Sequence, residues 1–134
     1  MPTILCIDDN PTVLALEKSL LENNGYKVVS APSGLTGLAL ARSHRLDAVV
    51  LDFRMPEMDG SQVAEVLTKE QPNLPLVIYS GCGYEVPEWL KWFAGSFLHK
   101  GDGPGALLAA LEKLTAKKEL GEVSNGIAAS NDAA

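Results

Sequence analysis

The chain has 134 residues, 46% of them hydrophobic and 21% charged, which is typical of one folded domain with its own core. Eleven basic and seventeen acidic residues give a net charge of −6 without any basic cluster, so direct binding to nucleic acid is not expected. No apolar run is long enough to span a bilayer, and the first residues lack the charged and apolar regions of a signal peptide. The two cysteines form neither a disulfide framework nor a metal-binding motif. These features predict a small cytoplasmic protein with no membrane partner.

Five short segments are expected to form buried strands, because each is a mostly apolar run bounded by turn residues. In chain order they are residues 3–7, 27–31, 48–51, 76–79 and 96–99. The last segment is the least apolar and is expected near an edge of the sheet.

A helix is expected after each strand. The first has Asn10 as its N-cap, Pro11 at its first position and Gly25 beyond its end. The other helices begin near residues 33, 61, 87 and 104. Apolar spacing predicts that the first helix buries Val13, Leu14, Leu16, Leu20 and Leu21, and that the second buries Leu35, Leu38, Ala39 and Ala41.

Alternation of strand and helix predicts an α/β fold with a parallel sheet, right-handed crossovers and helices on both faces. Residues 1–120 are expected to form this single domain. From residue 121 the composition shifts to Ala, Ser, Asn and Asp without periodicity, so residues 121–134 are expected to be a disordered polar tail or the start of a linker.

Polar side chains stand at the C-terminal ends of four expected strands: Asp8 and Asp9, Asp52, Ser80, and Lys100. All these ends lie at one edge of a parallel sheet, where open α/β folds hold their ligands. Neighbouring carboxylates repel unless a cation neutralises them, and oxygen ligands without Cys or clustered His suit Mg²⁺ or Mn²⁺. A metal, an ammonium and a hydroxyl around a nucleophilic carboxylate form a suitable receptor for a phosphoryl group.

This set, together with the MPEMDG turn at residues 55–60, resembles the receiver domain of two-component response regulators over about residues 3–118. The resemblance implies a flavodoxin-like fold with strand order 2-1-3-4-5 and five helices. It also implies that Asp52 is the phosphoacceptor, phosphorylated by a histidine kinase or a phosphotransfer protein. A protein of this family signals by conformational switching and protein contact.

The same resemblance assigns the metal ligands. Asp9, Asp52 and the backbone carbonyl of Arg54 would bind Mg²⁺, with Asp8 acting through a metal-bound water. Arg54 and Cys82, two residues past Asp52 and Ser80 respectively, are expected to tune the rate of dephosphorylation.

Three further residues match the phosphoryl-binding and switching positions of the family. Ser80 corresponds to the switch hydroxyl, Phe97 to the switch aromatic and Lys100 to the ammonium. Receivers usually have a cis proline after this lysine, whereas here Gly101 follows. A cis bond without proline would cost about 2.5–4 kcal/mol, so either this bond is trans or the loop differs.

Trp89 and Trp92 fall on the side formed by the fourth helix, the fifth strand and the fifth helix, which contacts partners in this family. Each could be either an interface anchor or a core residue. A homodimer through the same side is a further expectation.

Three functions are open on the sequence alone. The leading one is a receiver, standing alone or cut from a longer protein, that is not an enzyme beyond self-phosphorylation from a donor and autodephosphorylation. The second is a degenerate receiver that binds partners without phosphorylation, suggested by Gly101. The third is an aspartate-dependent phosphatase, disfavoured because Asp8 and Asp9 are adjacent where that class carries Asp-x-Asp.

Overall fold

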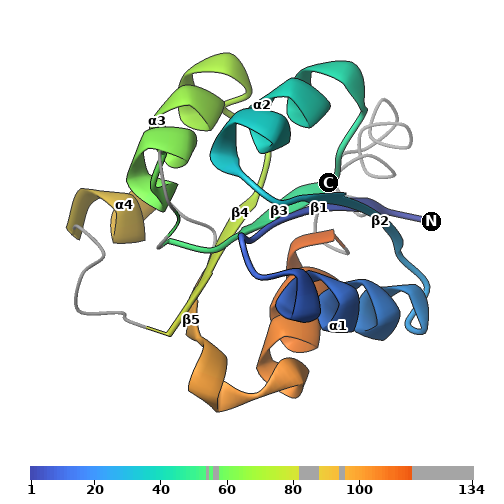
Figure 1. Cartoon of the computed structure of the whole chain (residues 1–134). Coiled ribbons are helices and arrows are strands. Elements are labelled where there is room, and N and C mark those ends of the chain that lie inside the picture. The colour runs from blue at the N-terminus through green and yellow to red at the C-terminus, as the bar shows by residue number, and fades with distance from the viewer. Residues whose placement is uncertain (54, 56–57, 82–87, 94–95, 116–134) are drawn as a thin grey trace, which may run out of the picture.

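The computed structural model of the chain describes residues 1–53, 55, 58–81, 88–93 and 96–115, of which 91–93 and 96 are described by their backbone only. Within these residues the architecture is a parallel sheet between two layers of helices (Figure 1). No helix in the described ranges is long and apolar enough to cross a bilayer.

The sheet has five parallel strands in the order β2-β1-β3-β4-β5, which confirms the predicted flavodoxin-like topology. The strands are β1 (Thr3–Ile7), β2 (Lys27–Ala31), β3 (Ala48–Leu51), β4 (Leu76–Ser80) and β5 (Ser96–His99). Their bounds agree with the predicted segments except that β4 runs one residue further and includes Ser80. The less apolar β5 lies at an edge, as expected.

Five helices are described, and each follows a strand as predicted. They are α1 (Pro11–Glu22), α2 (Gly34–Ser43), α3 (Gly60–Glu70), α4 (Glu88–Phe93) and a C-terminal helix over residues 104–115. Figure 1 shows α1 and the C-terminal helix on one face of the sheet, with α2, α3 and α4 on the other. Crossovers therefore cover both faces, as a fully parallel sheet requires.

Side-chain caps fix where the helices begin. The Asn10 side chain accepts hydrogen bonds from the backbone amides of Thr12 and Val13, and Pro11 occupies the first helical position. Asp59 caps α3 in a capping box with Gln62. These bonds satisfy amides that have no partner within the helix.

Alternation along the strands divides the core into two clusters. Leu5, Ile7, Val49, Leu51 and Ile78 belong to the cluster under α2, α3 and α4. The residues between them (Ile4, Cys6, Ala48, Val50 and Val77) belong to the cluster under α1 and the C-terminal helix. The period of two along each strand thus sets which helices a side chain meets.

The predicted inward face of α1 is confirmed only in part: Leu14 and Leu21 are buried and Val13 and Leu20 are partly buried, but Leu16 is not. Leu16 is 66% exposed, and the buried residues are Leu14, Glu17 and Leu21. Their spacing of three and four residues is that of one helix face, rotated from the expected one. A charged residue therefore occupies the middle of the buried stripe.

The face of α2 also differs from the expectation. Leu35 and Ala39 are exposed, whereas Gly34, Gly37, Leu38 and Ala41 are buried. A Cβ atom at Gly37 would lie 2.4 Å from Cδ1 of Ile7, so this glycine lets α2 approach β1 closely.

Candidate functional site

The functional edge of the sheet is formed where the strands end. Asp8 and Asp52 follow β1 and β3, and Lys100 follows β5. Continuing the alternation of each strand by one residue places all three on the side of α1 and the C-terminal helix. Asp8, Asp52 and Lys100 are far apart in sequence, but the alternation of side chains along the parallel strands places them on the same side of the sheet.

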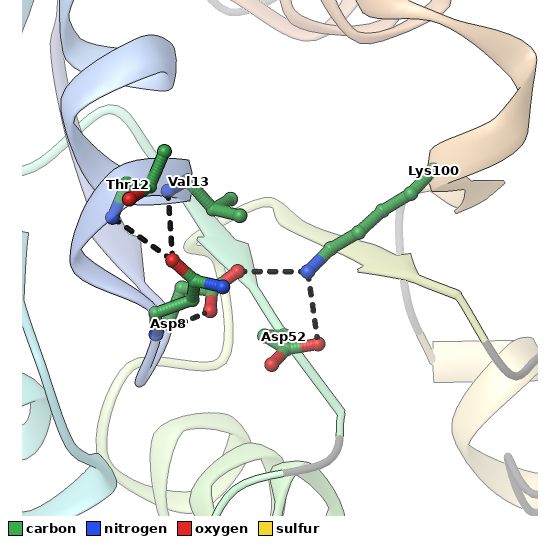
Figure 2. A network of polar contacts seen from close by, with 6 residues as sticks. Asp8, Thr12, Val13, Asp52 and Lys100 are labelled. Atoms are coloured by element: carbon green, nitrogen blue, oxygen red, sulfur yellow. Dashed lines mark hydrogen bonds and ion pairs between the residues drawn. The ribbon is translucent and has the colours of Figure 1, made fainter.

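Lys100 holds the two buried carboxylates together (Figure 2). Its Nζ lies 2.9 Å from Oδ2 of Asp8 and 3.5 Å from Oδ1 of Asp52. The other oxygen of Asp8, Oδ1, accepts a hydrogen bond of 2.9 Å from the backbone amide of Asn10. Both oxygens of Asp8 are thus partnered, and one oxygen of Asp52 faces the ammonium.

Gly101 does not displace the ammonium. The Lys100–Gly101 bond is trans, and a 3₁₀ turn over Lys100–Asp102 follows β5 directly. The contacts to Asp8 and Asp52 form with glycine at this position. Of the alternatives open on the sequence, the trans bond is the one observed.

Burial and neighbouring charge perturb the ionisation of this network. Burial and the adjacent Asp8 raise the pKa of Asp52 to about 6, although Lys100 opposes the rise. For Lys100, burial lowers the pKa, but the hydrogen bond to Asp8 and the charges of Asp52 and Asp8 outweigh it and raise the pKa above its ordinary value. Shifts of this kind cluster at functional sites because such sites hold charges in little water.

The acidic cluster has the donor chemistry of a site for a hard cation. One carboxylate oxygen each from Asp8, Asp9 and Asp52 lies within 4.8 Å of the others. Asp9 is exposed, whereas Asp8 and Asp52 are buried. Oxygen ligands close enough for one ion to bridge suit Mg²⁺. An added positive charge would relieve the carboxylate repulsion that adds to the effect of burial in raising the pKa of Asp52.

Phe53, the residue after Asp52, is held by the start of α3. The Gly60 amide donates a 2.7 Å hydrogen bond to the carbonyl of Phe53. A Cβ atom at Gly60 would lie 2.6 Å from Cα of Phe53, so only glycine permits this approach. The glycine of the MPEMDG turn therefore fixes the backbone that carries Asp52.

Ser80 and Phe97 lie on the other side of the sheet from the carboxylates. Ser80 is 1% exposed and is paired in register with His99. Phe97 packs against the cluster under α2, α3 and α4, and its ring meets that of His99 edge-on at 5.6 Å. His99 therefore points away from Lys100.

Several predicted residues fall outside the described part of the chain. Arg54 and Cys82 do so entirely, and Trp92 is described by its backbone only. Trp89, on α4, is 41% exposed, so a large part of its indole lies at the surface. The predicted tail, 121–134, is also outside the described residues.

Glu17 is the residue that the sequence prediction missed. Its side chain is buried beside Cys6, and burial together with the charge of Asp8 raises the pKa of Glu17 to about 7. Burial also raises the pKa of the Cys6 thiol well above its ordinary value, with Glu17 adding to the effect. The apolar spacing of α1 does not mark Glu17 as buried, because a charged side chain is not expected within a buried helix face.

Residues 4–112 match the family model of the response regulator receiver domain. The protein PilH of Pseudomonas aeruginosa is 39% identical over 80 residues, which cover 58% of this chain and 66% of PilH. The transcriptional regulatory protein GlrR of Escherichia coli is 40% identical over 80 residues, covering 60% of this chain but only 18% of GlrR. The match to GlrR therefore spans a small part of a longer protein.

Solved structures show the same architecture. A response regulator receiver domain protein from Clostridium thermocellum superposes with a TM-score of 0.82 at 29% identity, covering 90% of this chain and 98% of that one. The response regulator TrrA from Thermotoga maritima, solved in complex with Mg²⁺-BeF, gives a TM-score of 0.80 at 27% identity. The superposition covers 85% of this chain and 99% of TrrA.

Proposed function

Because this chain belongs to the family of response regulator receiver domains, whose members are signalling switches of two-component systems, we propose that it is a working phosphoacceptor. A histidine kinase or phosphotransfer protein would supply the phosphoryl group, and Asp52 would receive it. The observation that carries the proposal is the contact of Lys100 with both Asp8 and Asp52 at the end of the sheet.

In the proposed transfer, a carboxylate oxygen of Asp52 attacks phosphorus. The new oxygen–phosphorus bond forms as the bond from phosphorus to the donor imidazole nitrogen breaks, and the imidazole leaves with the bonding electron pair. Lys100, 3.5 Å from Oδ1 of Asp52, is positioned to stabilise negative charge on the phosphoryl oxygens. Asp8 holds that ammonium in place from its buried position.

The acidic cluster is proposed to hold Mg²⁺, with Mn²⁺ as a substitute. Asp9 and Asp52 would be direct ligands together with the backbone carbonyl of Arg54, and Asp8 would act through a bound water. That division is supported by the partners of Asp8, because Lys100 and the Asn10 amide already use both of its oxygens. When bound, the ion supplies positive charge that neutralises the phosphoryl oxygens.

Switching is proposed to pass through Ser80 and Phe97. Phosphorylation adds about −1.5 to −2 charges at the end of β3, and the Ser80 hydroxyl would turn toward them. Phe97, packed on the side of α4, would move with it. A downstream protein, or a second copy of the chain, would then recognise the side formed by α4, β5 and the C-terminal helix, with Trp89 as an anchor and Trp92 as a second candidate.

Arg54 and Cys82 are proposed to control the lifetime of the phosphorylated state by lining the path of the attacking water. Replacing Arg54 with alanine is expected to change the rate at which phosphorylated protein decays in the presence of Mg²⁺. An unchanged decay rate would remove Arg54 from this role.

The central test is incubation with Mg²⁺ and acetyl phosphate, followed by intact-mass measurement. We expect one phosphoryl group on the wild type and none on Asp52→Asn. Asp102→Asn, which removes an exposed carboxylate in the turn after β5, should be labelled like the wild type. Labelling of Asp52→Asn would refute the assignment, and absence of labelling on the wild type would favour a receiver that binds partners without phosphorylation.

A further inference from the structure

A cavity of about 400 Å³ opens between α1 and the C-terminal helix, on the face of the sheet that carries Asp52. Its walls are mostly apolar: Val13, Leu16 and Leu20 come from α1, and Pro104 and Leu107 from the C-terminal helix. Small-molecule sites have this size and this composition, with a few polar groups to orient the ligand. The exposed side chain of Leu16, which the core does not use, lies at this cavity.

Glu17 supplies the polar group. It lines the cavity and is only 6% exposed, yet its Oε1 finds no hydrogen-bond partner among the described residues. A buried acceptor without a partner is costly, and native proteins seldom keep one without a role. Glu17 makes no contact that the proposed phosphoryl transfer uses.

The charges around the cavity select a cation. Lys100 also lines it, but its Nζ is directed at Asp8 and Asp52 (Figure 2). Tyr79, the remaining polar lining residue, is an uncharged phenol at neutral pH, and burial raises its pKa further. Glu17 is therefore the charged group with an oxygen still to be paired, and an anionic ligand would be repelled by it and by Asp8.

We propose that this cavity binds a small primary amine with an apolar body, the ammonium pairing with Glu17 and the body lying against Leu16, Leu20 and Leu107. Such a ligand would satisfy the buried acceptor and cover apolar surface at the same time. Because Lys100 forms part of the cavity wall and also pairs with Asp52, a bound ligand would alter the environment of Asp52 through Lys100. The receiver would then respond to a small molecule in addition to any phosphorylation.

Titration of the ¹⁵N-labelled full chain with 2-phenylethylamine at about pH 8 tests the proposal. A ligand of about nine heavy atoms is expected to bind in the millimolar range. Saturable shifts should appear in the amides of Val13, Leu16, Leu20 and Leu107. The anion 3-phenylpropionate, which has the same apolar body, should cause no saturable shift at these amides.

The amine affinities of three variants distinguish pairing of the ammonium with Glu17 from non-specific apolar binding. Glu17→Gln should weaken amine binding about tenfold or more, because it removes a charge-assisted bond. Leu16→Ala should weaken it several-fold by removing apolar wall, and Glu22→Gln, an exposed change on the same helix, should leave it unchanged.

Equal binding of amine and anion, or full affinity in Glu17→Gln, would overturn the proposal. So would shifts that follow protein concentration instead of amine, since a second copy of the chain would then be the occupant. Binding is measured without phosphorylation, so failure of this proposal and failure of labelling at Asp52 are separate results.

Discussion

Replacing Glu17 by glutamine should make the protein less sensitive to alkaline pH. Glu17 is buried against β1, and burial and Asp8 raise its pKa from an ordinary value near 4.5 to about 7, with Lys100 opposing the rise. Glutamine keeps the size of the side chain but carries no charge at any pH. The variant therefore removes the titration while leaving the helix intact.

The size of the effect follows from the two pKa values. Between about pH 4.5 and 7 the folded state binds the Glu17 proton more tightly than the unfolded chain does, so stability falls as pH rises through this window. The full difference corresponds to about 3 kcal/mol. Between pH 5 and pH 8 the free energy of unfolding of the wild type should fall by about 2.5 kcal/mol relative to that of Glu17→Gln.

Urea unfolding of both proteins at several pH values from 5 to 8 measures this difference. The raised pKa of Asp52 acts in the same direction in both chains and largely cancels in the comparison. Glu22→Gln is the matched control, because Glu22 is exposed on the same helix and pairs with Lys18. Parallel pH profiles for wild type and Glu17→Gln would show that Glu17 titrates normally and would refute the reasoning.

Two further changes test the packing around the site, both by chemical denaturation. Gly60→Ala should destabilise the fold by about 1–3 kcal/mol, because the new Cβ would lie 2.6 Å from Cα of Phe53. In the control Gly101→Ala, the new Cβ would meet nothing within 4 Å, so this change should destabilise the fold much less. Asn10→Ala should lower the free energy of unfolding by about 0.5–2 kcal/mol, because it removes the N-terminal cap of α1. Asn23→Ala, at the other end of α1, should lower it less. Equal losses of stability in the two variants would contradict the capping role of Asn10.

The fold was predictable because each strand carries its own signal. Unbroken apolar runs such as Ala48–Leu51 are bounded by turn residues, and caps such as Asn10 and Asp59 mark the helix starts. Helix faces were harder to predict. On α2, small residues such as Gly37 are buried because the helix lies close to β1, so hydrophobicity alone selected the exposed Leu35.

The site was predictable to the extent that it depends on strand ends. A parallel sheet gathers the residues after its strands at one edge, so Asp8, Asp52 and Lys100 could be placed together without coordinates. Glu17 enters from a helix, and its burial depends on the rotation of α1 against the sheet. No local pattern of apolar residues encodes that rotation when a charged residue occupies the buried stripe.

The position of Lys100 affects whether the chain needs a bound ion in order to fold. Some small metal-binding domains fold only with their ion, because the site does not exist in the unfolded chain and ion binding supplies the free energy of folding. Here the Lys100 ammonium, 2.9 Å from Asp8 and 3.5 Å from Asp52, already offsets part of the repulsion between these carboxylates from within the chain. We therefore expect the chain to reach its native state with or without divalent ions, so that the proposed Mg²⁺ site would affect phosphorylation and not folding.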